Sequence, residues 1–478
     1  MIEMIAALLG GVLYGLIIGI IPAAGATTGL IALFGFISYF VHEPYLGVIF
    51  LMAVVAASTT GDSFTAILLG IPGANSAAAT MVDGFPLAQQ GRAGYAISAA
   101  VTTSTVNGLI WGCLVFLLLP WYTNLIMILG IPELWAFTVL ALATVGFLSN
   151  KYWFRTILAI AFGIFIGLVG VNPENNEPRF TLGWFYLEDG VQIMAVAAGL
   201  FAIPELVKGL FTKTSTANGE IRKGELVAGM KAVWENRWLA LRGGFIGAFI
   251  GLLPGLGGQM ADWLAYGSAV AANPKEKFGN GNIKGVIGPE GANNSQKATS
   301  MITTVIFGIP GAKFAAILMS LFMYLNIELG TPDIAEDKEL FTSMTFGFLG
   351  ATVIVALICM FLIKPICKIA SVPYKYYFPV LLALIIFTSM QYTGGWEDLA
   401  MLAIFSCLGF FCKHFMFSRP ALLIGYILAD KVEGFTLQLL GIYTWETLIT
   451  RPIFMVLIVC IIGILIFSIT RKGKIDYA

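Results

Sequence analysis

The sequence predicts an all-α polytopic membrane protein with two inverted structural repeats, built from broken helices and re-entrant hairpins. Three observations predict this fold class: apolar segments recur along the chain, two glycine-proline motifs each occur twice in the same order, and basic loops alternate with acidic loops. Of the 478 residues, 58% are hydrophobic and only 11% are charged, whereas soluble domains contain about 25% charged residues. The chain is therefore expected to lie in a lipid bilayer.

Composition also argues against several other classes of protein. The chain has 27 basic and 27 acidic residues, without a Lys/Arg-rich run of the kind that binds nucleic acid. The six cysteines lie in or beside apolar runs and form no C-x-x-C pair, so we interpret them as small buried hydrophobes. The two histidines, His42 and His414, lie on different segments without a cysteine or carboxylate cluster. We expect no metal site and no cofactor.

Segments that cross the bilayer are predicted from their apolar length, because a membrane-spanning helix needs about 20 residues. Full-length candidates are predicted near 95–120, 124–147, 153–170, 190–208, 340–363, 376–392, 397–412, 420–441 and 452–470. The N-terminal stretch contains Glu3 and no basic residue, so we interpret it as the first membrane segment rather than a secretory leader. The regions 4–87 and 240–330 are apolar but interrupted, which predicts half-helices of about 10 to 18 residues.

The loops alternate in charge, which predicts the side of the membrane on which each lies, because cytoplasmic loops collect Lys and Arg. Basic residues occur at Arg92, 151–155, 208–242, 364–375, 413–419 and the C-terminal RKGK, and acidic loops occur at 172–179, 331–339 and 394–398. The C-terminus is thus expected in the cytoplasm and the N-terminus in the periplasm. The long polar segment predicts a first membrane repeat at 1–208, a cytoplasmic linker at 209–240, and a second membrane repeat at 241–478 with a cytoplasmic tail.

Two short motifs are repeated between the halves of the chain. The sequence GLIIGIIPAAG around Pro22 matches GAFIGLLPGLG around Pro254, 232 positions later, and the GIPGA motif around Pro72 returns around Pro310, 238 positions later. Because Arg92 follows the first copy on the predicted inside and Asp333 follows the second on the predicted outside, we expect the copies to run in opposite directions. Paired Gly/Pro-interrupted segments of this kind mark the binding site of secondary transporters.

The breaks predict a polar site at membrane depth. Broken backbone persists there only where it is buried in protein or lines a wet cavity, and freed helix N-termini attract carboxylates while carbonyl ends attract Na⁺. Polar residues flank the breaks. Candidates for substrate binding are Thr27, Thr28, Asn75, Ser76, Asn293, Asn294 and Lys313, and candidates for ion coupling are Ser58, Thr59, Asp62, Ser63, Gln259 and Lys297.

Each candidate also has a structural interpretation. The hydroxyl groups could hold membrane helices together, and Asp62 could form an ion pair with a lysine that only locks the bundle. Lys297 or Lys313 could pair with an anionic substrate, or could extend to the membrane interface. Asp83, on a Gly/Pro turn before Arg92, is interpreted as a structural turn carboxylate.

A channel and an intramembrane enzyme are the alternatives to a carrier. A channel would need a repeated filter or a ring of charge, and neither is present in the sequence. An intramembrane enzyme would need a second catalytic motif beside Gly61-Asp62, or a Ser/His or His/Glu arrangement, and none is visible. We therefore predict that the protein is not an enzyme.

Five sequence blocks resemble the large membrane subunit of tripartite tricarboxylate transporters, the TctA family. They are LLGIPGANSAAATMVDGFPLAQQGRAG, GLLPGLGG, PEGANNSQ, FGIPGA and SRPALLIGYILADKVEG, and they extend over nearly the whole chain. The resemblance implies a bacterial inner-membrane carrier of the elevator type that imports organic di- or tricarboxylates by symport with Na⁺ or H⁺. It also implies a small membrane subunit and a periplasmic solute-binding protein as partners, and leaves open whether the chain forms a homo-oligomer.

The resemblance adds the turn residues to the candidate substrate site. They are Pro22, Gly25, Pro72, Gly73, Pro254, Gly257, Pro310 and Gly311, with the pair Asn293 and Asn294. The sequence departs from the family pattern at its first turn, Pro-Ala-Ala-Gly, and at Asp262, Lys297 and Lys313, where small or neutral residues are expected. The two lysines fit an anion with more, or differently spaced, carboxylates; alternatively, one of them replaces a bound cation with a fixed positive charge.

Overall fold

The fold is described from a computed structural model. It describes residues 2–21, 25–128, 130–148, 153–171, 177–211, 221–222, 224–254, 257–331, 334, 337–370, 374–390, 393 and 395–470. At 75, 118–128, 145–148, 153, 209, 465 and 467–470 the description covers the backbone alone. Pro22, which was predicted to begin the first break, lies outside the described residues.

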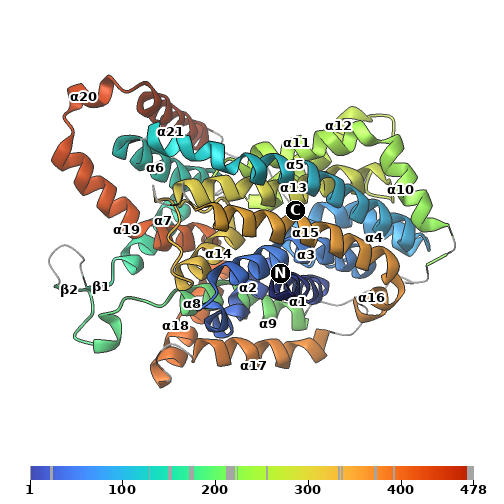
Figure 1. The fold of residues 1–478 in the computed structure, drawn as a ribbon, viewed down its shortest axis with the longest axis horizontal. Coiled ribbons are helices and arrows are strands. Elements are labelled where there is room, and N and C mark those ends of the chain that lie inside the picture. Colours follow the sequence, from blue (N-terminus) through green and yellow to red (C-terminus); the bar gives the residue numbers. More distant parts are fainter. Residues whose placement is uncertain are drawn as a thin grey trace.

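Helices make up almost all of the described chain (Figure 1). In the first half they are α1 (Ile2–Ile20), α2 (Gly25–Ala32), η1 (Leu33–Gly35), η2 (Ile37–Phe40), α3 (Pro44–Leu69), η3 (Asn75–Ala77), α4 (Ala78–Gln89), α5 (Ala93–Ile128), α6 (Ile131–Leu148), α7 (Trp153–Gly167), η4 (Phe185–Leu187), α8 (Ile193–Ala197), the π-helical η5 (Ala198–Ala202) and α9 (Ile203–Phe211). Two short strands, β1 (Gly170–Val171) and β2 (Pro178–Arg179), pair in antiparallel fashion.

The second half continues the helical pattern. Its elements are α10 (Glu225–Glu235), α11 (Arg237–Gly251), α12 (Gly257–Ala272), α13 (Lys284–Phe307), α14 (Lys313–Tyr324), α15 (Lys338–Phe361), α16 (Ile363–Ala370), η7 (Tyr374–Tyr376), α17 (Tyr377–Ser389), α18 (Trp396–His414), α19 (Arg419–Ile442), α20 (Trp445–Ile449) and α21 (Pro452–Thr470).

Four of the described helices are long and apolar enough to cross a membrane: α1, α3, α5 as far as Leu117, and α15. Shorter apolar helices accompany them, among them α6, α7, α14, α17 and α21. Length and composition therefore support the prediction of an all-α, multi-pass membrane protein.

Three boundary predictions were wrong. The interrupted regions do not consist only of short pieces, because α3 has 26 residues and α13 has 24. The segment predicted at 124–147 is divided, since α5 extends to Ile128 and α6 begins at Ile131. The segment predicted at 190–208 is not one α-helix, because a π-helical turn lies between α8 and α9. Apolar composition predicts which segments lie in the membrane, but it does not predict where one helix ends and the next begins.

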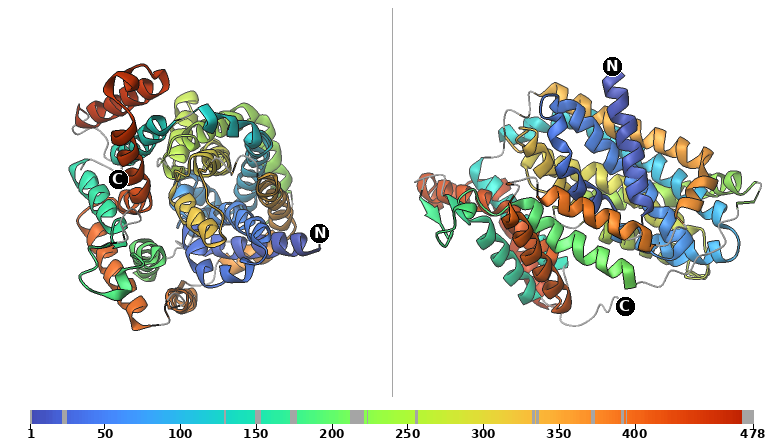
Figure 2. Two further views of the ribbon diagram at one scale, coloured as in Figure 1. Left: turned by 60° about the vertical axis from the view of Figure 1, so that its left-hand side comes forward. Right: turned by 90° about the horizontal axis from the view of Figure 1, so that it is seen from below.

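The helices form a core bundle and a flanking group (Figures 1 and 2). The core bundle contains α1, α3, α4, α5, α11, α12, α13 and α15, so both halves of the chain contribute to it. The flanking group contains α6, α7, α19 and α21, which pack mainly on one another. At the centre of the core bundle, α13 packs against α11, α5, α12 and α4, and every residue from 285 to 307 is buried.

Close helix contacts in the core bundle depend on glycine. Helix α1 packs on α3 and α11 packs on α13, each through a row of glycines four residues apart. A Cβ atom on Gly15 would lie 2.7 Å from the carbonyl oxygen of Val54, and one on Gly251 would lie 2.5 Å from that of Gln296. Small residues let membrane helices approach closely and add van der Waals contact where no hydrophobic effect drives them together.

The two GIPGA motifs lie at the ends of the two long core helices. Gly70 ends α3 with a φ of 61° and Gly308 ends α13 with a φ of 59°, the left-handed conformation that glycine adopts without strain at a helix C-terminus. After each turn the chain folds back, as α4 packs against α3 and α14 against α13. The motifs therefore form the turns of two helical hairpins, α3–α4 and α13–α14, at corresponding positions.

Asp83 joins the first hairpin to the loop between α12 and α13. It lies on α4 rather than on a turn, and its buried Oδ1 accepts hydrogen bonds from the backbone N–H groups of Gly279, Gly281 and Asn282 at 2.8 to 2.9 Å. The hydroxyl of Tyr266 donates to Oδ2 at 3.0 Å. The interpretation of Asp83 as structural is supported, although its role is to hold a distant loop.

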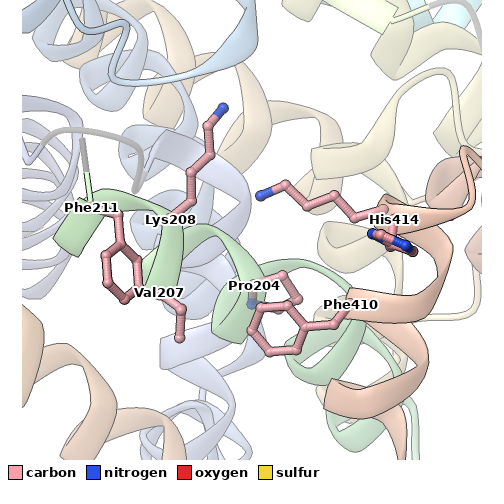
Figure 3. Close-up of a pocket in the computed structure, with 7 residues that line it drawn as sticks. Pro204, Val207, Lys208, Phe211, Phe410 and His414 are labelled. Carbon is pink, nitrogen blue, oxygen red and sulfur yellow. The ribbon is translucent and has the colours of Figure 1, made fainter.

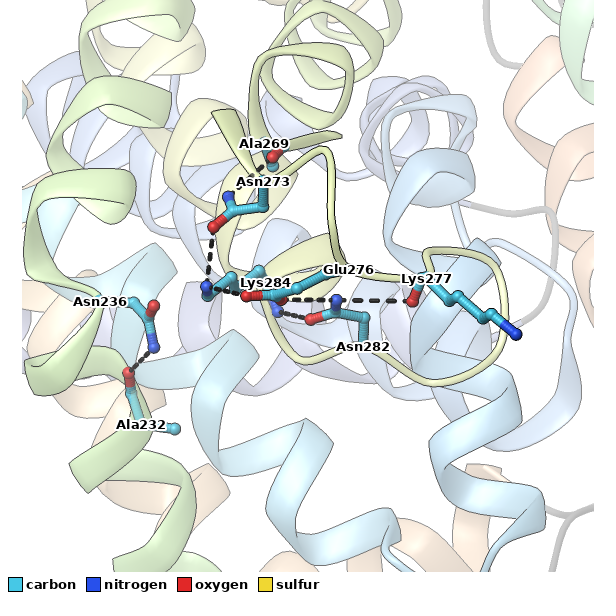
Figure 4. A network of polar contacts seen from close by, with 8 residues as sticks. All are labelled: Ala232, Asn236, Ala269, Asn273, Glu276, Lys277, Asn282 and Lys284. Atoms are coloured by element: carbon cyan, nitrogen blue, oxygen red, sulfur yellow. Dashed lines mark hydrogen bonds and ion pairs between the residues drawn. The ribbon is translucent and has the colours of Figure 1, made fainter. Parts of the chain in front are cut away.

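A second polar network orders the same loop (Figure 4). The ammonium group of Lys284 donates to Asn273 and Glu276, and the Asn282 side chain also donates to Glu276. The hydrogen bond from Lys284, and to a lesser degree that from Asn282, holds the pKa of the Glu276 carboxyl below its usual range. The loop is thus fixed from within by this network and from outside by Asp83.

Replacing Asp83 with alanine is expected to release this loop. Three N–H groups and one hydroxyl lose their acceptor, and hydrogen bonds to a charged group contribute about 1.5 to 3 kcal/mol each. We expect a lower unfolding temperature and new protease cleavage within 273–283. Lys275→Gln, at an exposed position of the same loop, is the control and should change both much less; equal effects would contradict the assignment to Asp83.

Candidate functional site

Four charged side chains meet inside the core bundle. They are Asp62 on α3, Asp262 on α12, and Glu290 and Lys297 on α13, with exposed fractions of 0%, 1%, 0% and 4%. Each of them interacts electrostatically with the others of the group. We call this set the charged cluster. Ionisable residues inside a membrane bundle are costly, so they mark functional positions by default.

Hydroxyl groups satisfy only part of the charged cluster. Ser63 and Thr80 each donate to Oε1 of Glu290 at 2.8 Å, and the ammonium group of Lys297 donates to Thr59. By contrast, both carboxylate oxygens of Asp62, both of Asp262 and Oε2 of Glu290 are buried without a hydrogen-bond partner among the described residues. Buried carboxylate oxygens without donors can be satisfied by a proton or by a cation.

The charge balance leads to the same conclusion. If all four groups ionise, three carboxylates face one ammonium group, which leaves two negative charges inside the bundle. Such charges are not stable in a low-dielectric interior unless they are neutralised. The charged cluster therefore has the chemistry to take up protons, or a cation at a single carboxylate. Among the described residues no three Asp, Glu, His or Cys side chains are placed to hold one metal ion together.

The first GIPGA turn lies against the charged cluster. A Cβ atom on Gly73 would lie 2.9 Å from Oδ1 of Asp62, and one on Gly25, where α2 begins, would lie 3.2 Å from the carbonyl oxygen of Gly73. Gly25 has a φ of 58°, and Gly257, where α12 begins, has a φ of 71°. The breaks at Gly25 and Gly73 are thus brought together, and Asp62 is next to them.

The start of α12 joins the same region from the other half of the chain. A Cβ atom on Gly258 would lie 3.2 Å from Oε1 of Gln296 and 3.3 Å from Cβ of Ser76. Both polar atoms of the Gln296 side chain are buried without a hydrogen-bond partner among the described residues. A helix N-terminus, an amide and the Ser76 side chain therefore face one another, which is a suitable arrangement for a carboxylate.

The two asparagines lie on α13 between Glu290 and Lys297. Both polar atoms of the Asn293 side chain lack a hydrogen-bond partner in the described part of the chain, whereas Asn294 donates to the carbonyl oxygen of Ser104 at 3.4 Å. Buried amides are normally satisfied. Asn293 is therefore the better candidate for a ligand contact, and Asn294 has a partly structural role.

The second GIPGA turn packs mainly on its own helix. The N–H group of Gly311 donates to Thr304 at 3.2 Å, Pro310 is buried, and the ammonium group of Lys431, from α19, lies against Gly308 and 3.5 Å from the carbonyl oxygen of Leu329. Because α14 folds back, the Phe314 ring lies 5.8 Å from Lys297. This turn reaches the charged cluster through Phe314 rather than through its own polar groups.

Lys313 is not brought to the charged cluster. Its ammonium group lies 5.5 Å from the centre of the Phe201 ring, and its electrostatic neighbours are Arg419 and Glu205. These partners belong to η5, α9 and α19. Lys313 thus contacts the flanking side of α14, while Lys297 contacts the core side.

The remaining predicted residues have more ordinary surroundings. Ser58 and Thr59 donate to the carbonyl oxygen of Val55 on their own helix, and Thr59 also accepts from Lys297. Thr28 is buried and Thr27 and Pro72 are half-buried, while Gln259 is exposed on α12. The carbonyl oxygen of Pro254 accepts a hydrogen bond from Thr144 at 2.6 Å. The side chain of Asn75 lies outside the described part of the structure.

Sequence reasoning missed Glu290, Thr80 and Gln296 as site residues. Glu290 lies in the block PEGANNSQ, from which only the two asparagines were chosen as candidates, and the structure places it in the buried first half of α13. The signal that could have found it is its charge within a predicted membrane region. Asp262 was noted only as a departure from the family pattern, and the structure places it in the charged cluster.

Interrupted helices around a buried charged cluster, in a multi-pass helical bundle, define a membrane transport protein. Sequence comparison identifies the family to which the chain belongs. The model described as "Tripartite tricarboxylate transporter TctA family" matches residues 5–424, and the chain belongs to this family. The family consists of transporter components rather than enzymes, so the protein is a tricarboxylate transporter component.

Two curated proteins of Agrobacterium vitis are similar to the chain. The "Uncharacterized 52.8 kDa protein in TAR-I ttuC' 3'region" is 28% identical over 425 residues, which cover 88% of this chain and 84% of that protein. The "Uncharacterized protein in TAR-II ttuC' 3'region" is 28% identical over 237 residues, 47% of this chain and 96% of that protein. No solved structure matches the chain.

Proposed function

We propose that the protein is the large membrane subunit of a tripartite system that imports organic di- or tricarboxylates across the bacterial inner membrane, coupled to a gradient of Na⁺ or H⁺. The observation that carries the proposal is the charged cluster, with two surplus negative charges and five buried carboxylate oxygens that lack a hydrogen-bond partner. A small membrane subunit and a periplasmic solute-binding protein complete the system.

Coupling follows from the charge of the cluster. Protons or cations that neutralise Asp62, Asp262 and Glu290 make the region less negative, so an anionic substrate can approach the neighbouring turn and the start of α12. Lys297 and the amide of Asn293 are then available to the carboxylates of the substrate. Ion and substrate thus favour each other's binding, which is the requirement for symport.

The repeated hairpins support the transport mechanism. We infer that hairpins α3–α4 and α13–α14, whose glycine turns match, belong to two repeats in opposite orientation. In this arrangement the N-terminus would lie in the periplasm and the C-terminus in the cytoplasm. The flanking group, which packs mainly on itself, would be one body and the core bundle the other in an elevator movement.

Uptake into proteoliposomes tests the proposal. The purified chain, with its binding protein and small subunit, is reconstituted and offered labelled di- and tricarboxylates with a Na⁺ gradient, a proton gradient or neither. Saturable uptake that depends on one gradient is expected. Flux of every carboxylate that is independent of both gradients, or that does not saturate, would reject a coupled carrier.

Glu290→Gln is expected to separate coupling from folding. The amide oxygen of glutamine still accepts from Ser63 and Thr80, so the fold should remain, but one neutralisable carboxylate is lost. We expect gradient-driven uptake to fall at least about tenfold, with less change in exchange of substrate across the membrane. Glu235→Gln, at an exposed pair with Lys231, is the control. Normal gradient dependence in Glu290→Gln would remove Glu290 from the coupling site.

A further inference from the structure

A pocket of about 470 Å³ lies at the C-terminal ends of α9 and α18 (Figure 3), and none of its lining residues belongs to the charged cluster. Its lining comes from two helices outside both the core bundle and the flanking group: Pro204, Val207, Lys208 and Phe211 from α9, and Phe410, Lys413 and His414 from α18. Figure 3 shows Lys208 and His414 on either side of Pro204 and Phe410. The pocket therefore combines basic groups with an apolar wall.

The polar side of the pocket has a surplus of positive charge. Lys413 interacts electrostatically with Glu205, Arg419 and Lys208. Glu205, the carboxylate in this group, already accepts a hydrogen bond from Arg419 at 2.7 Å, and Arg419 also donates to the carbonyl oxygen of Leu200. In the part of the chain that the structure describes, one carboxylate here faces three cations, so the pocket is suited to an anion that bridges α9 and α18.

The apolar side of the pocket faces outward. The Phe211 side chain is 81% exposed and Phe410 is 39% exposed. Both lie on helices that end in basic residues, as expected where a helix leaves the hydrocarbon region and its lysines reach the headgroups. A ligand with a phosphate and long apolar chains would satisfy both sides at once.

We propose that this pocket binds the headgroup of an anionic phospholipid, with the phosphate between Lys208 and Lys413 and the acyl chains along Phe211 and Phe410. Basic pockets between membrane helices on the cytoplasmic side hold such headgroups. A phosphate can accept charge-assisted hydrogen bonds from both lysines, which would join α9 and α18.

The site has a structural link to the core bundle. The Phe201 ring, in the π-helical turn that precedes α9, lies 5.5 Å from the ammonium group of Lys313 on α14 and 5.5 Å from the guanidinium of Arg419. A lipid that holds α9 against α18 therefore also holds the surface on which the α13–α14 hairpin packs. Because it binds the folded state, it should raise the unfolding temperature.

Native mass spectrometry and thermal unfolding test the lipid site. The full chain in detergent is titrated with phosphatidylglycerol, and separately with phosphatidylcholine and with sn-glycerol 3-phosphate. We expect phosphatidylglycerol alone to be retained and to raise the unfolding temperature. In Lys208→Gln/Lys413→Gln, retention should fall roughly tenfold or more. Lys208→Arg/Lys413→Arg should keep it, because charge and donors remain, and Lys231→Gln, on exposed α10, should not change it.

Three outcomes would overturn the proposal. They are equal retention of the two phospholipids by the wild-type chain, unchanged retention in the double glutamine variant, and equal binding of sn-glycerol 3-phosphate, which would assign the pocket to a soluble phosphate instead. Lys208 is exposed and Lys413 half-buried, so the glutamine variant is expected to fold. Its unfolding temperature without lipid, compared with that of Lys231→Gln, checks this directly.

Discussion

Replacing Lys297 with methionine is expected to prevent stable folding at neutral pH and to abolish transport. Lys297 is the only basic side chain of the charged cluster, and its removal leaves three buried carboxylates without a counter-charge. Lys297 forms no direct ion pair among the described residues, but it is within electrostatic reach of all three carboxylates, and a buried charge without compensation costs several kcal/mol. Such a loss is a large fraction of the total stability of a protein.

A double variant shows whether this loss comes from charge or from packing. In Lys297→Met/Asp62→Asn one positive and one negative charge are removed together, so we expect much of the stability to return while coupled uptake stays lost. The unfolding temperature and the yield of monodisperse protein measure the first effect, and uptake into proteoliposomes measures the second. Lys231→Met, at an exposed pair with Glu235, is the control. A double variant no more stable than Lys297→Met would contradict the charge argument.

Gly247→Ala is expected to be nearly as damaging, for a steric reason. A Cβ atom at this position would overlap the carbonyl oxygen of Ala292 and the hydroxyl of Ser295, and would lie 2.5 Å from Cα of Ala292. The neighbours are mostly backbone of α13, so they cannot turn away, and α11 must move outward. Overpacking of a close-packed interior costs about 1 to 3 kcal/mol and occasionally more. The shift would also displace α13, which carries Glu290 and Lys297.

Gly267→Ala is the matched control for this steric effect. Gly267 lies on α12, is exposed, and has no atom within 4 Å of the position that a Cβ would occupy. Alanine favours the helix by about 1 kcal/mol over glycine, so this variant should be as stable as the wild type or slightly more so. Thermal unfolding and size-exclusion profiles of the two variants measure the difference. Similar stability in both would show that α11 and α13 are less closely packed than described here.

Part of the candidate site could be predicted from local sequence. The GIPGA motifs identified the ends of α3 and α13, because a left-handed glycine followed by proline ends a helix whatever surrounds it. Asp62 and Lys297 were predicted by charge in an apolar context, and both lie in the charged cluster. The placement of Lys313 in the same site was not predicted correctly, because it points toward the flanking helices.

The family followed from short motifs, and the comparison with the TctA family confirmed it over nearly the whole chain. The membrane location and the helical class were predicted from the apolar segments. In lipid the backbone must satisfy its own hydrogen bonds, and an apolar segment of about 20 residues does so as a helix. The inverted orientation, the elevator movement and the coupling ion stay predictions, which the uptake experiments and variants above address.

The sequence by itself determined what depends on neighbouring residues: apolar length, helix ends at glycine and proline, and the repetition of both. Tertiary structure alone decided which charges meet. Asp62, Asp262 and Glu290 come from three helices and from both halves of the chain, and only the packing of α3, α12 and α13 makes them one cluster. The physical reason is that electrostatic energy depends on distance in space and on burial, and neither can be read from separation along the chain.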